Sequence, residues 1–258
     1  MQSTEFNLPE GEEIVYVRPP VEQYNGSLPN FYEPAAFPNL KILKDNWKEI
    51  RDEVLAYEKK IGLLNDMDSH TPPDNTKNLW SHTYLMSYLR IFHRNRKKFP
   101  VFSKIIDQIP NCTYATISIL PPDTEILPHF GDTNGVIRTH LGLVVPAPYP
   151  AIAIKVGEDE RGWEEGELLC FTIVNKHEAW NRSPYRRYIV ILDFVPNELA
   201  HRKMEIVCNT LGSQSFTFLY KKFAFVRRLP SFIHIMCCKL FTLAWRMYLP
   251  IQRRFEFL

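Results

Sequence analysis

Apolar and polar residues alternate along several short segments of the chain, which is the pattern of β-strands that bury one face. In segment 136–145, side chains two positions apart share a face, so Arg138 and His140 are expected on the same wall. Segment 187–195 is rich in β-branched residues and predicts a second strand that begins with Arg187. Because a buried guanidinium group requires an anion, these strands indicate a charged site inside a sheet.

Segments that are predicted to be helical precede and follow these strands. Apolar residues recur at helical intervals in segment 40–61, which predicts an amphipathic helix. Nineteen mostly apolar residues lie between Pro230 and Pro250 and predict a helix near the C-terminus. The Pro-rich residues 1–30 are expected to wrap the surface as an N-terminal extension, and segment 65–77 is expected to be a loop.

The composition favours one β-rich domain. The 258 residues are 45% hydrophobic and 13% aromatic, enough for one sizeable core, and 20 prolines suit many short strands with flanking helices. Five cysteines, an odd number without paired zinc spacing, are typical of a reducing compartment. The chain does not start with basic residues and an apolar run, so we expect a cytoplasmic protein without a signal peptide.

Imidazole and guanidinium groups gather in two short stretches that begin at His129 and at His177. The first stretch also contains Arg138 and His140, and the second contains Arg187. Two separated imidazoles can hold a metal ion, and a planar guanidinium group can hold a carboxylate through two hydrogen bonds. These residue types together predict a site for iron and an oxo-acid.

The ordered motifs of the chain resemble those of the aspartyl/asparaginyl β-hydroxylase family of iron(II)- and 2-oxoglutarate-dependent oxygenases. In order, they are His129-x-Gly131-x-Thr133-Asn134, Arg138-x-His140-Leu-Gly-Leu, Trp163-x-x-Gly166, His177-Glu178-x-Trp180 and Arg187. The similarity extends more weakly upstream and covers roughly residues 30 to 200. An ordered match of several parts is more specific than any single motif.

The resemblance implies a mainly β fold with flanking helices around a double-stranded β-helix, a jelly-roll or cupin-like core, over residues 31–210. It implies that His129 and His177 bind Fe(II). It also implies that Arg187 pairs with the distal carboxylate of 2-oxoglutarate, helped by Ser118 in a strand of its own. With dioxygen as the second cosubstrate, such an enzyme hydroxylates an unactivated C–H bond and converts 2-oxoglutarate to succinate and CO2.

The remaining residues of the implied site have open alternatives. Arg138 and His140 are implied to contact the other carboxylate of the cosubstrate, or the substrate. His140 is alternatively a hydrogen-bonded core histidine, and Arg187 alternatively neutralises Asp193. Ser118 is alternatively a small filler in its strand. The Trp residues of the motifs are interpreted as packing, whereas the aromatic segment 80–92 is expected to line the substrate entrance.

The position of the usual metal-binding carboxylate is vacant. In the wider superfamily a carboxylate stands two residues after the first histidine, but Gly131 stands there, as it does in the family that the chain resembles. Asp132 follows, and strand alternation predicts that it points away from the metal; contact with iron, directly or through water, is the alternative. Oxidative halogenation at the vacancy is a weaker hypothesis.

The C-terminal tail, residues 211–258, is basic and apolar. Residues 216–258 contain eight Lys or Arg and one acid, whereas the preceding residues contain 23 basic and 28 acidic side chains. Lys239 lies in the middle of the apolar stretch, which favours a helix at a membrane surface over a spanning helix. A helix packed on the barrel or on a second subunit is the main alternative, and no nucleic-acid motif accompanies the charge.

The sequence leaves several substrates open. A lipid acyl chain at a membrane is our first hypothesis, because the tail is apolar and basic, and this would place the protein peripherally at the inner face of a membrane. An Asp or Asn side chain in a peptide, or a free amino acid, is the alternative. A barrel that binds without catalysis is disfavoured by the complete set of His and Arg residues.

Overall fold

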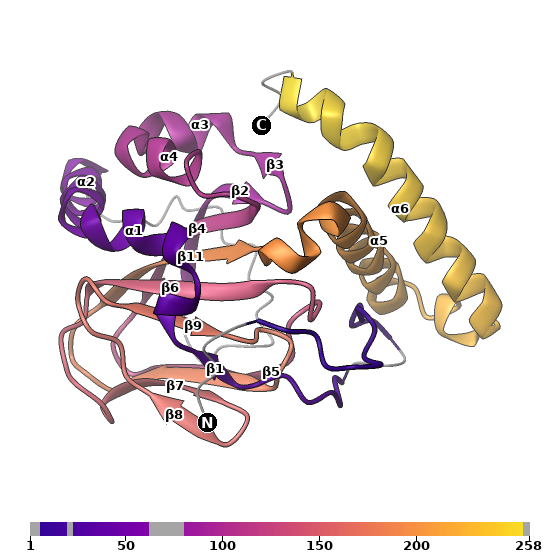
Figure 1. Cartoon of the computed structure of the whole chain (residues 1–258), viewed down its shortest axis with the longest axis horizontal. Helices are drawn as coiled ribbons and strands as arrows, with labels where there is room; N and C mark the ends of the chain where they lie inside the picture. Colours follow the sequence, from indigo (N-terminus) through magenta and orange to yellow (C-terminus); the bar gives the residue numbers. More distant parts are fainter. Residues whose placement is uncertain (1–5, 20–22, 62–79, 255–258) are drawn as a thin grey trace.

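The computed structural model describes residues 6–19, 23–61 and 80–254, in which two antiparallel β-sheets form the core (Figure 1). Seven strands form one sheet in the order β1-β9-β6-β11-β4-β2-β3, and four form the other in the order β5-β10-β7-β8. The strands are β1 (Phe31–Tyr32), β2 (Ser81–Ser87), β3 (Arg90–Ile91), β4 (Cys112–Leu120), β5 (Thr124–His129), β6 (Ile137–Val144), β7 (Ile152–Val156), β8 (Asp159–Arg161), β9 (Leu168–Phe171), β10 (His177–Asn181) and β11 (Arg187–Phe194). This arrangement confirms the mainly β fold with a double-stranded β-helix core.

Helices flank the sheets on two sides (Figure 1). They are α1 (Lys41–Asp45), α2 (Trp47–Ile61), α3 (His93–Lys98), α4 (Pro100–Ile106), α5 (Lys203–Lys222) and α6 (Ser231–Arg254). Short 3-10 turns are η1 (Pro34–Ala36), η2 (Pro38–Leu40), η5 (Asn197–Arg202) and η6 (Val226–Arg228). The helices α1 to α4 gather at one end of the molecule, and the α5–α6 pair lies at the other.

The single helix that we predicted over residues 40–61 is wrong in one respect, because it is interrupted at Asn46. The side-chain Nδ2 of Asn46 donates a hydrogen bond to the Ile42 carbonyl at 2.7 Å, in competition with the helical pattern of the backbone. The amphipathic character is confirmed, since Leu43, Ile50 and Val54 are buried.

The N-terminal segment does more than wrap the surface, because Phe6, Ile14 and Leu28 are buried in the main core. It is tied to the loop that follows β5: the Val15 amide donates to Asn134 Oδ1 at 2.8 Å. Sparse apolar residues between prolines carry no helical or strand period, so their burial was not predictable from the pattern. The predicted loop 65–77 lies outside the described residues.

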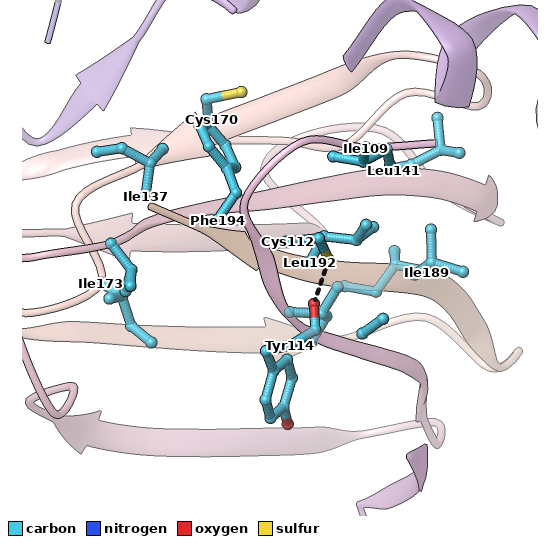
Figure 2. Packing of buried hydrophobic residues seen from close by; sticks show 14 of the residues in the cluster. Ile109, Cys112, Tyr114, Ile137, Leu141, Cys170, Ile173, Ile189, Leu192 and Phe194 are labelled. Atoms are coloured by element: carbon cyan, nitrogen blue, oxygen red, sulfur yellow. Dashed lines mark hydrogen bonds between the residues drawn. The ribbon is translucent and has the colours of Figure 1, made fainter. Parts of the chain in front are cut away.

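Buried apolar side chains pack between the strands on which the candidate site residues stand (Figure 2). Buried side chains from β6, β9 and β11 pack together there: Ile137, Leu141, Cys170, Leu192 and Phe194. At the start of β4, Cys112 Sγ donates a hydrogen bond to the Tyr114 carbonyl at 3.4 Å, beside a shift in the register between β4 and β11. This packing fixes the faces of β6 and β11 and so the direction of their polar side chains.

The C-terminal part forms two packed helices. α5 begins at Lys203, and α6 continues through Pro250 to Arg254. Pro250 lacks an amide hydrogen, but the next turn is held by Gln252, whose side chain accepts from the Ile91 amide at 3.1 Å and donates to the Ile91 carbonyl at 2.8 Å. The segment Ser231–Gln252 is long and apolar enough to cross a membrane, by length and composition alone.

Candidate active site

His129 and His177 face each other across two neighbouring strands. The residues are direct partners in the β5–β10 register, and their ring centroids lie 4.1 Å apart. In each ring Nδ1 is 2.8 Å from a backbone carbonyl oxygen two residues earlier, that of Leu127 or Asn175. A carbonyl only accepts, so Nδ1 carries the proton and Nε2 keeps its lone pair. This is the tautomer that binds a metal ion.

Burial keeps both imidazoles neutral. It lowers the pKa of His129, with a smaller contribution in the same direction from Arg138. The pKa of His177 lies well below its ordinary value because of burial and then of His129. Neutral imidazoles with fixed tautomers and open positions around them fit a divalent metal of intermediate softness such as Fe(II).

No third side chain completes a metal cluster within the parts of the chain that the structure describes. At Gly131, the position of the usual carboxylate, a Cβ atom would lie 2.6 Å from the Ile173 carbonyl oxygen and 2.5 Å from Ile173 Cγ1. The backbone of Ile173 therefore excludes any side chain at this position. The Gly131 amide also donates to that carbonyl at 3.0 Å, which keeps the two segments in contact.

Asp132 is held by hydrogen bonds from residues other than His129 and His177. Its Oδ2 accepts hydrogen bonds from the Tyr88 hydroxyl and, at 2.9 Å, from Gln214 Nε2 of α5. Tyr88 and Leu89 form a turn with positive φ angles of 49° and 62°, an unfavourable conformation for non-glycine residues. The carboxylate thus ties the loop after His129 to the β2–β3 turn and to α5.

Arg187 is a buried charge without a partner. Its side chain is 1% exposed, and its Nε and Nη2 atoms find no acceptor among the described residues. The guanidinium group lies 4.8 Å from the Trp163 ring centroid, and burial lowers the pKa of Arg187 to about 9, so the group stays charged at neutral pH. An unpaired buried charge is costly, and a carboxylate could satisfy both nitrogens with parallel bonds.

Arg138 already has its carboxylate. Arg138 Nε lies 2.6 Å from Asp193 Oδ1, and Arg138 Nη2 lies 2.7 Å from Asp193 Oδ2. Burial opposes the charge on Arg138, but Asp193 raises the pKa of the guanidinium overall. The alternative that Arg187 neutralises Asp193 is therefore wrong, because these two residues are separated by six positions, roughly 20 Å of strand. Only the N–H groups of Arg138 that do not bind Asp193 are available for the predicted contact with the cosubstrate.

Only one of the two ring nitrogens of His140 has a hydrogen-bond partner among the described residues. Trp163 Nε1 donates to His140 Nδ1 at 3.2 Å, so the proton of the neutral imidazole resides on Nε2. His140 Nε2 is buried and has no partner in the described structure. Burial, followed by the charges of Arg138 and Arg187, places the pKa of His140 well below its ordinary value. The result is a fixed neutral donor, and Trp163, which we interpreted as packing, orients it.

Ser118 is oriented by an aromatic side chain. Trp80 Nε1 donates to Ser118 Oγ at 2.9 Å, which leaves the hydroxyl hydrogen of the buried Ser118 free to donate elsewhere. His82 lies opposite Ser118 in the strand register and stacks with Tyr84. Sequence reasoning missed His82, although the alternation Trp80, His82, Tyr84 places all three on one face of a strand.

All six predicted site residues line one pocket. They are Ser118, His129, Arg138, His140, His177 and Arg187. Apolar side chains complete its wall, among them Ile126, Ile154 and Phe171, and Trp80 and Trp163 also contribute. The pocket thus combines two imidazole nitrogens with free lone pairs, a guanidinium group unpaired among the described residues, and neutral donors in apolar surroundings.

Comparison with known proteins agrees with this geometry. Residues 44–196 match the profile of the family described as aspartyl/asparaginyl beta-hydroxylase. An ornithine lipid ester-linked acyl 2-hydroxylase of Rhizobium tropici is 32% identical over 170 residues, which are 65% of this chain and 60% of that protein. The aspartyl/asparaginyl beta-hydroxylase of Homo sapiens is 34% identical over 166 residues, 62% of this chain and 21% of that protein. The chain thus spans less than two thirds of either relative.

Among solved structures, a viral collagen prolyl hydroxylase from Paramecium Bursaria Chlorella virus-1, in complex with 2OG, superposes with a TM-score of 0.38. The sequence identity is 11%, and the match covers 58% of this chain and 91% of that one.

Proposed function

Since the chain belongs to the aspartyl/asparaginyl β-hydroxylase family, we propose that it is an Fe(II)- and 2-oxoglutarate-dependent dioxygenase. It would hydroxylate an unactivated C–H bond of its substrate while 2-oxoglutarate is converted to succinate and CO2. His129 and His177 would hold the iron through Nε2, and Arg187 would hold the distal carboxylate of 2-oxoglutarate.

The observation that carries this proposal is the unpaired Arg187 in the same pocket as the two histidines. A buried guanidinium group with two free donors needs a planar acceptor, and a carboxylate has that shape. A dicarboxylic oxo-acid has a carboxylate for Arg187 at one end, and an oxo-acid group for the metal at the other. This combination favours 2-oxoglutarate over a monocarboxylate.

Several residues of the chain would position the cosubstrate. The Trp163 ring supports the Arg187 guanidinium group at 4.8 Å and orients His140, whose Nε2–H can donate to a carboxylate oxygen. The free hydroxyl hydrogen of Ser118 is a further donor. When bound, iron(II) supplies the activation of dioxygen that the oxidation requires. The apolar side chains of the wall would lower the local dielectric constant, which strengthens each of these electrostatic contacts.

A membrane-associated lipid acyl chain is the substrate that we propose. Supporting this, the relative from Rhizobium tropici is named an ester-linked acyl 2-hydroxylase of ornithine lipid. The apolar wall of the pocket also suits a hydrocarbon chain. The human relative, named aspartyl/asparaginyl beta-hydroxylase, supports the alternative, an Asp or Asn side chain in a peptide. The proposed location is the cytoplasmic face of a membrane.

A labelling experiment tests both parts. The purified chain would be incubated with Fe(II), 2-oxoglutarate and isotopically labelled dioxygen, together with a lipid extract or a peptide pool. We expect succinate to form and one labelled oxygen atom to enter an acyl chain. Labelled peptide with unlabelled lipid would instead establish the alternative substrate. Absence of succinate formation with intact iron binding would contradict the proposed use of 2-oxoglutarate.

A further inference from the structure

The inner face of α6 is fixed on α5. Trp245 Nε1 donates to Ser215 Oγ at 2.9 Å, and Thr242 Oγ1 donates to Asn209 Oδ1 at 3.2 Å. At Gly212 of α5 a Cβ atom would lie 2.9 Å from the Thr242 amide nitrogen, so glycine permits the close approach of the two helices. Together with the two bonds from Gln252 to Ile91, these contacts make α6 a docked helix with a defined orientation.

The opposite face of α6 is apolar and exposed. Six large side chains recur at intervals of three or four residues and therefore form one stripe along the helix. We call it the outer stripe; its members are Phe232, Met236, Leu240, Leu243, Met247 and Ile251, and each is at least 51% exposed. Phe218 and Phe225, at the end of the helix pair, are also exposed. A contiguous apolar surface of this kind marks an interaction site.

The helix pair that carries the outer stripe is basic and lacks acidic residues along most of its length. Residues 206–254 contain no Asp or Glu but eight Lys or Arg: Lys221, Lys222, Arg227, Arg228, Lys239, Arg246, Arg253 and Arg254. Lys239 and Arg246 are exposed and, seven residues apart on the helix, follow one border of the stripe. Lys222 lies 5.3 Å from the Phe218 ring centroid and so combines charge with apolar surface at the end of the helix pair.

We propose that the outer stripe and its basic border dock α6 in the plane of an anionic membrane surface. A helix with one apolar face and a basic edge inserts into the boundary between headgroups and acyl chains, and the cations meet anionic lipid. A spanning placement fits less well, because it would bring Lys239 and the polar contacts with α5 into hydrocarbon. A second copy of the chain would bring Lys239 and Arg246 near like charges, which disfavours it as the occupant.

The helix pair that carries the outer stripe also contacts the loop that follows His129. Gln214 of α5 donates to Asp132, three residues after His129, at 2.9 Å. Membrane docking through α6 would therefore hold the site end of the barrel close to the lipid. The docking proposal does not depend on the proposed reaction, because it concerns binding to vesicles and not turnover.

Vesicle co-sedimentation of the full chain tests the proposal. We expect binding to vesicles of phosphatidylcholine mixed with phosphatidylglycerol, weaker binding to phosphatidylcholine alone, and loss of binding as salt is added. The double substitution Lys239→Gln, Arg246→Gln should weaken binding to the mixed vesicles about 25-fold, at about fivefold for each charge. Leu240→Ser with Leu243→Ser should weaken it on the order of tenfold for each side chain.

Matched controls come from α2, which lies at the far end of the molecule from α6 (Figure 1). Lys59→Gln with Lys60→Gln removes two exposed charges there, and Leu55→Ser removes an exposed leucine. Neither control should change vesicle binding, and circular dichroism would check that every variant is folded. Equal loss in the controls would overturn the assignment to α6. Absent vesicle binding, with a dimer in sedimentation velocity that Leu240→Ser and Leu243→Ser dissolve, would overturn it in favour of a second copy.

Discussion

The barrel pocket and the α5–α6 helix pair differ in what they leave without a partner. In the pocket, polar groups are buried and have no partner within the described part of the chain: two guanidinium nitrogens of Arg187 and one imidazole nitrogen of His140. On α6 the side chains of Thr242 and Trp245 are hydrogen-bonded to α5, and large apolar side chains such as Leu240 and Met247 are exposed to water. Each arrangement costs free energy in the isolated chain.

The difference indicates what each region binds. A buried cation is stabilised by an anion that enters the pocket, so we expect the inside of the barrel to select a small acidic molecule. An exposed apolar stripe is stabilised by an extended apolar surface, so the outside of the helix pair selects something large. The same physical rule, that a group without a partner indicates the chemistry of its ligand, thus predicts a small anion in one region and a large apolar surface in the other. Four predictions test this contrast inside the barrel.

The largest effect is expected at the metal pair. Replacement of His129 or His177 by Ala removes one of the two proposed imidazole ligands, and iron binding and succinate formation should both be abolished. The loss should exceed the ten- to hundredfold reduction that is typical when an outer partner of a ligand is removed, by about an order of magnitude or more. Iron content after desalting measures the first effect directly. The exposed His201→Ala serves as the control, and retention of iron in both single variants would refute the assignment.

The next largest effect concerns the ion pair that is already complete. Arg138→Gln should lower the free energy of unfolding by about 3 to 5 kcal/mol, because Asp193, 0% exposed, is left as an uncompensated buried charge. Asp193→Asn should be similarly destabilising. The double replacement of both residues by Leu should recover much of the loss, since it removes both charges. Urea unfolding monitors all three variants. An additive double variant would show that the two groups are not coupled.

Smaller effects are expected at Arg187, where changes should weaken the binding of 2-oxoglutarate but can raise the free energy of unfolding. Arg187→Lys keeps the charge but loses the second bond, worth about 1.5 to 3 kcal/mol, so the affinity for 2-oxoglutarate should fall about 10- to 150-fold. Arg187→Met should abolish 2-oxoglutarate binding yet raise the free energy of unfolding of the ligand-free chain, because it removes an unpaired buried charge. Calorimetric titration and urea unfolding measure the two quantities. A destabilised Arg187→Met variant would mean that Arg187 has a structural partner after all.

Ordered motifs made the fold and most of the pocket predictable. The alternation around Arg138 and His140 gave β6, and the β-branched run after Arg187 gave β11. The structure brings the six predicted residues together, although no bound group tests their roles. The motif order was informative because each part has its own required residue type, so a chance match of all parts is improbable.

Contacts between distant strands were not predictable in the same way. The pairing of Arg138 with Asp193 depends on the register between β6 and β11, which includes an irregularity near Tyr188. A single sequence does not contain that register, because any shift by two residues preserves the same faces. The role of Trp163 was missed for a related reason: its hydrogen bond to His140 joins a loop to a strand that lies 23 residues earlier. The break at Asn46 was a local competition that periodicity does not describe.

The effect that is smallest for each pH unit is a change in the dependence of stability on pH, and it concerns His82, on which the charges of the same two cations act. Burial, and then the charges of Arg138 and Arg187, lower the pKa of His82 from 6.5 to about 3. The unfolded chain therefore binds a proton below about pH 6.5 that the folded chain refuses, so stability is complete above pH 6.5 and falls as the pH drops towards 3. In His82→Phe, which keeps an aromatic ring but cannot titrate, this fall should be smaller by about 1.4 kcal/mol per pH unit. Urea unfolding of the metal-free chain at several pH values in that window measures the slope. An unaltered slope in His82→Phe would show that burial and the two nearby cations do not keep this histidine neutral.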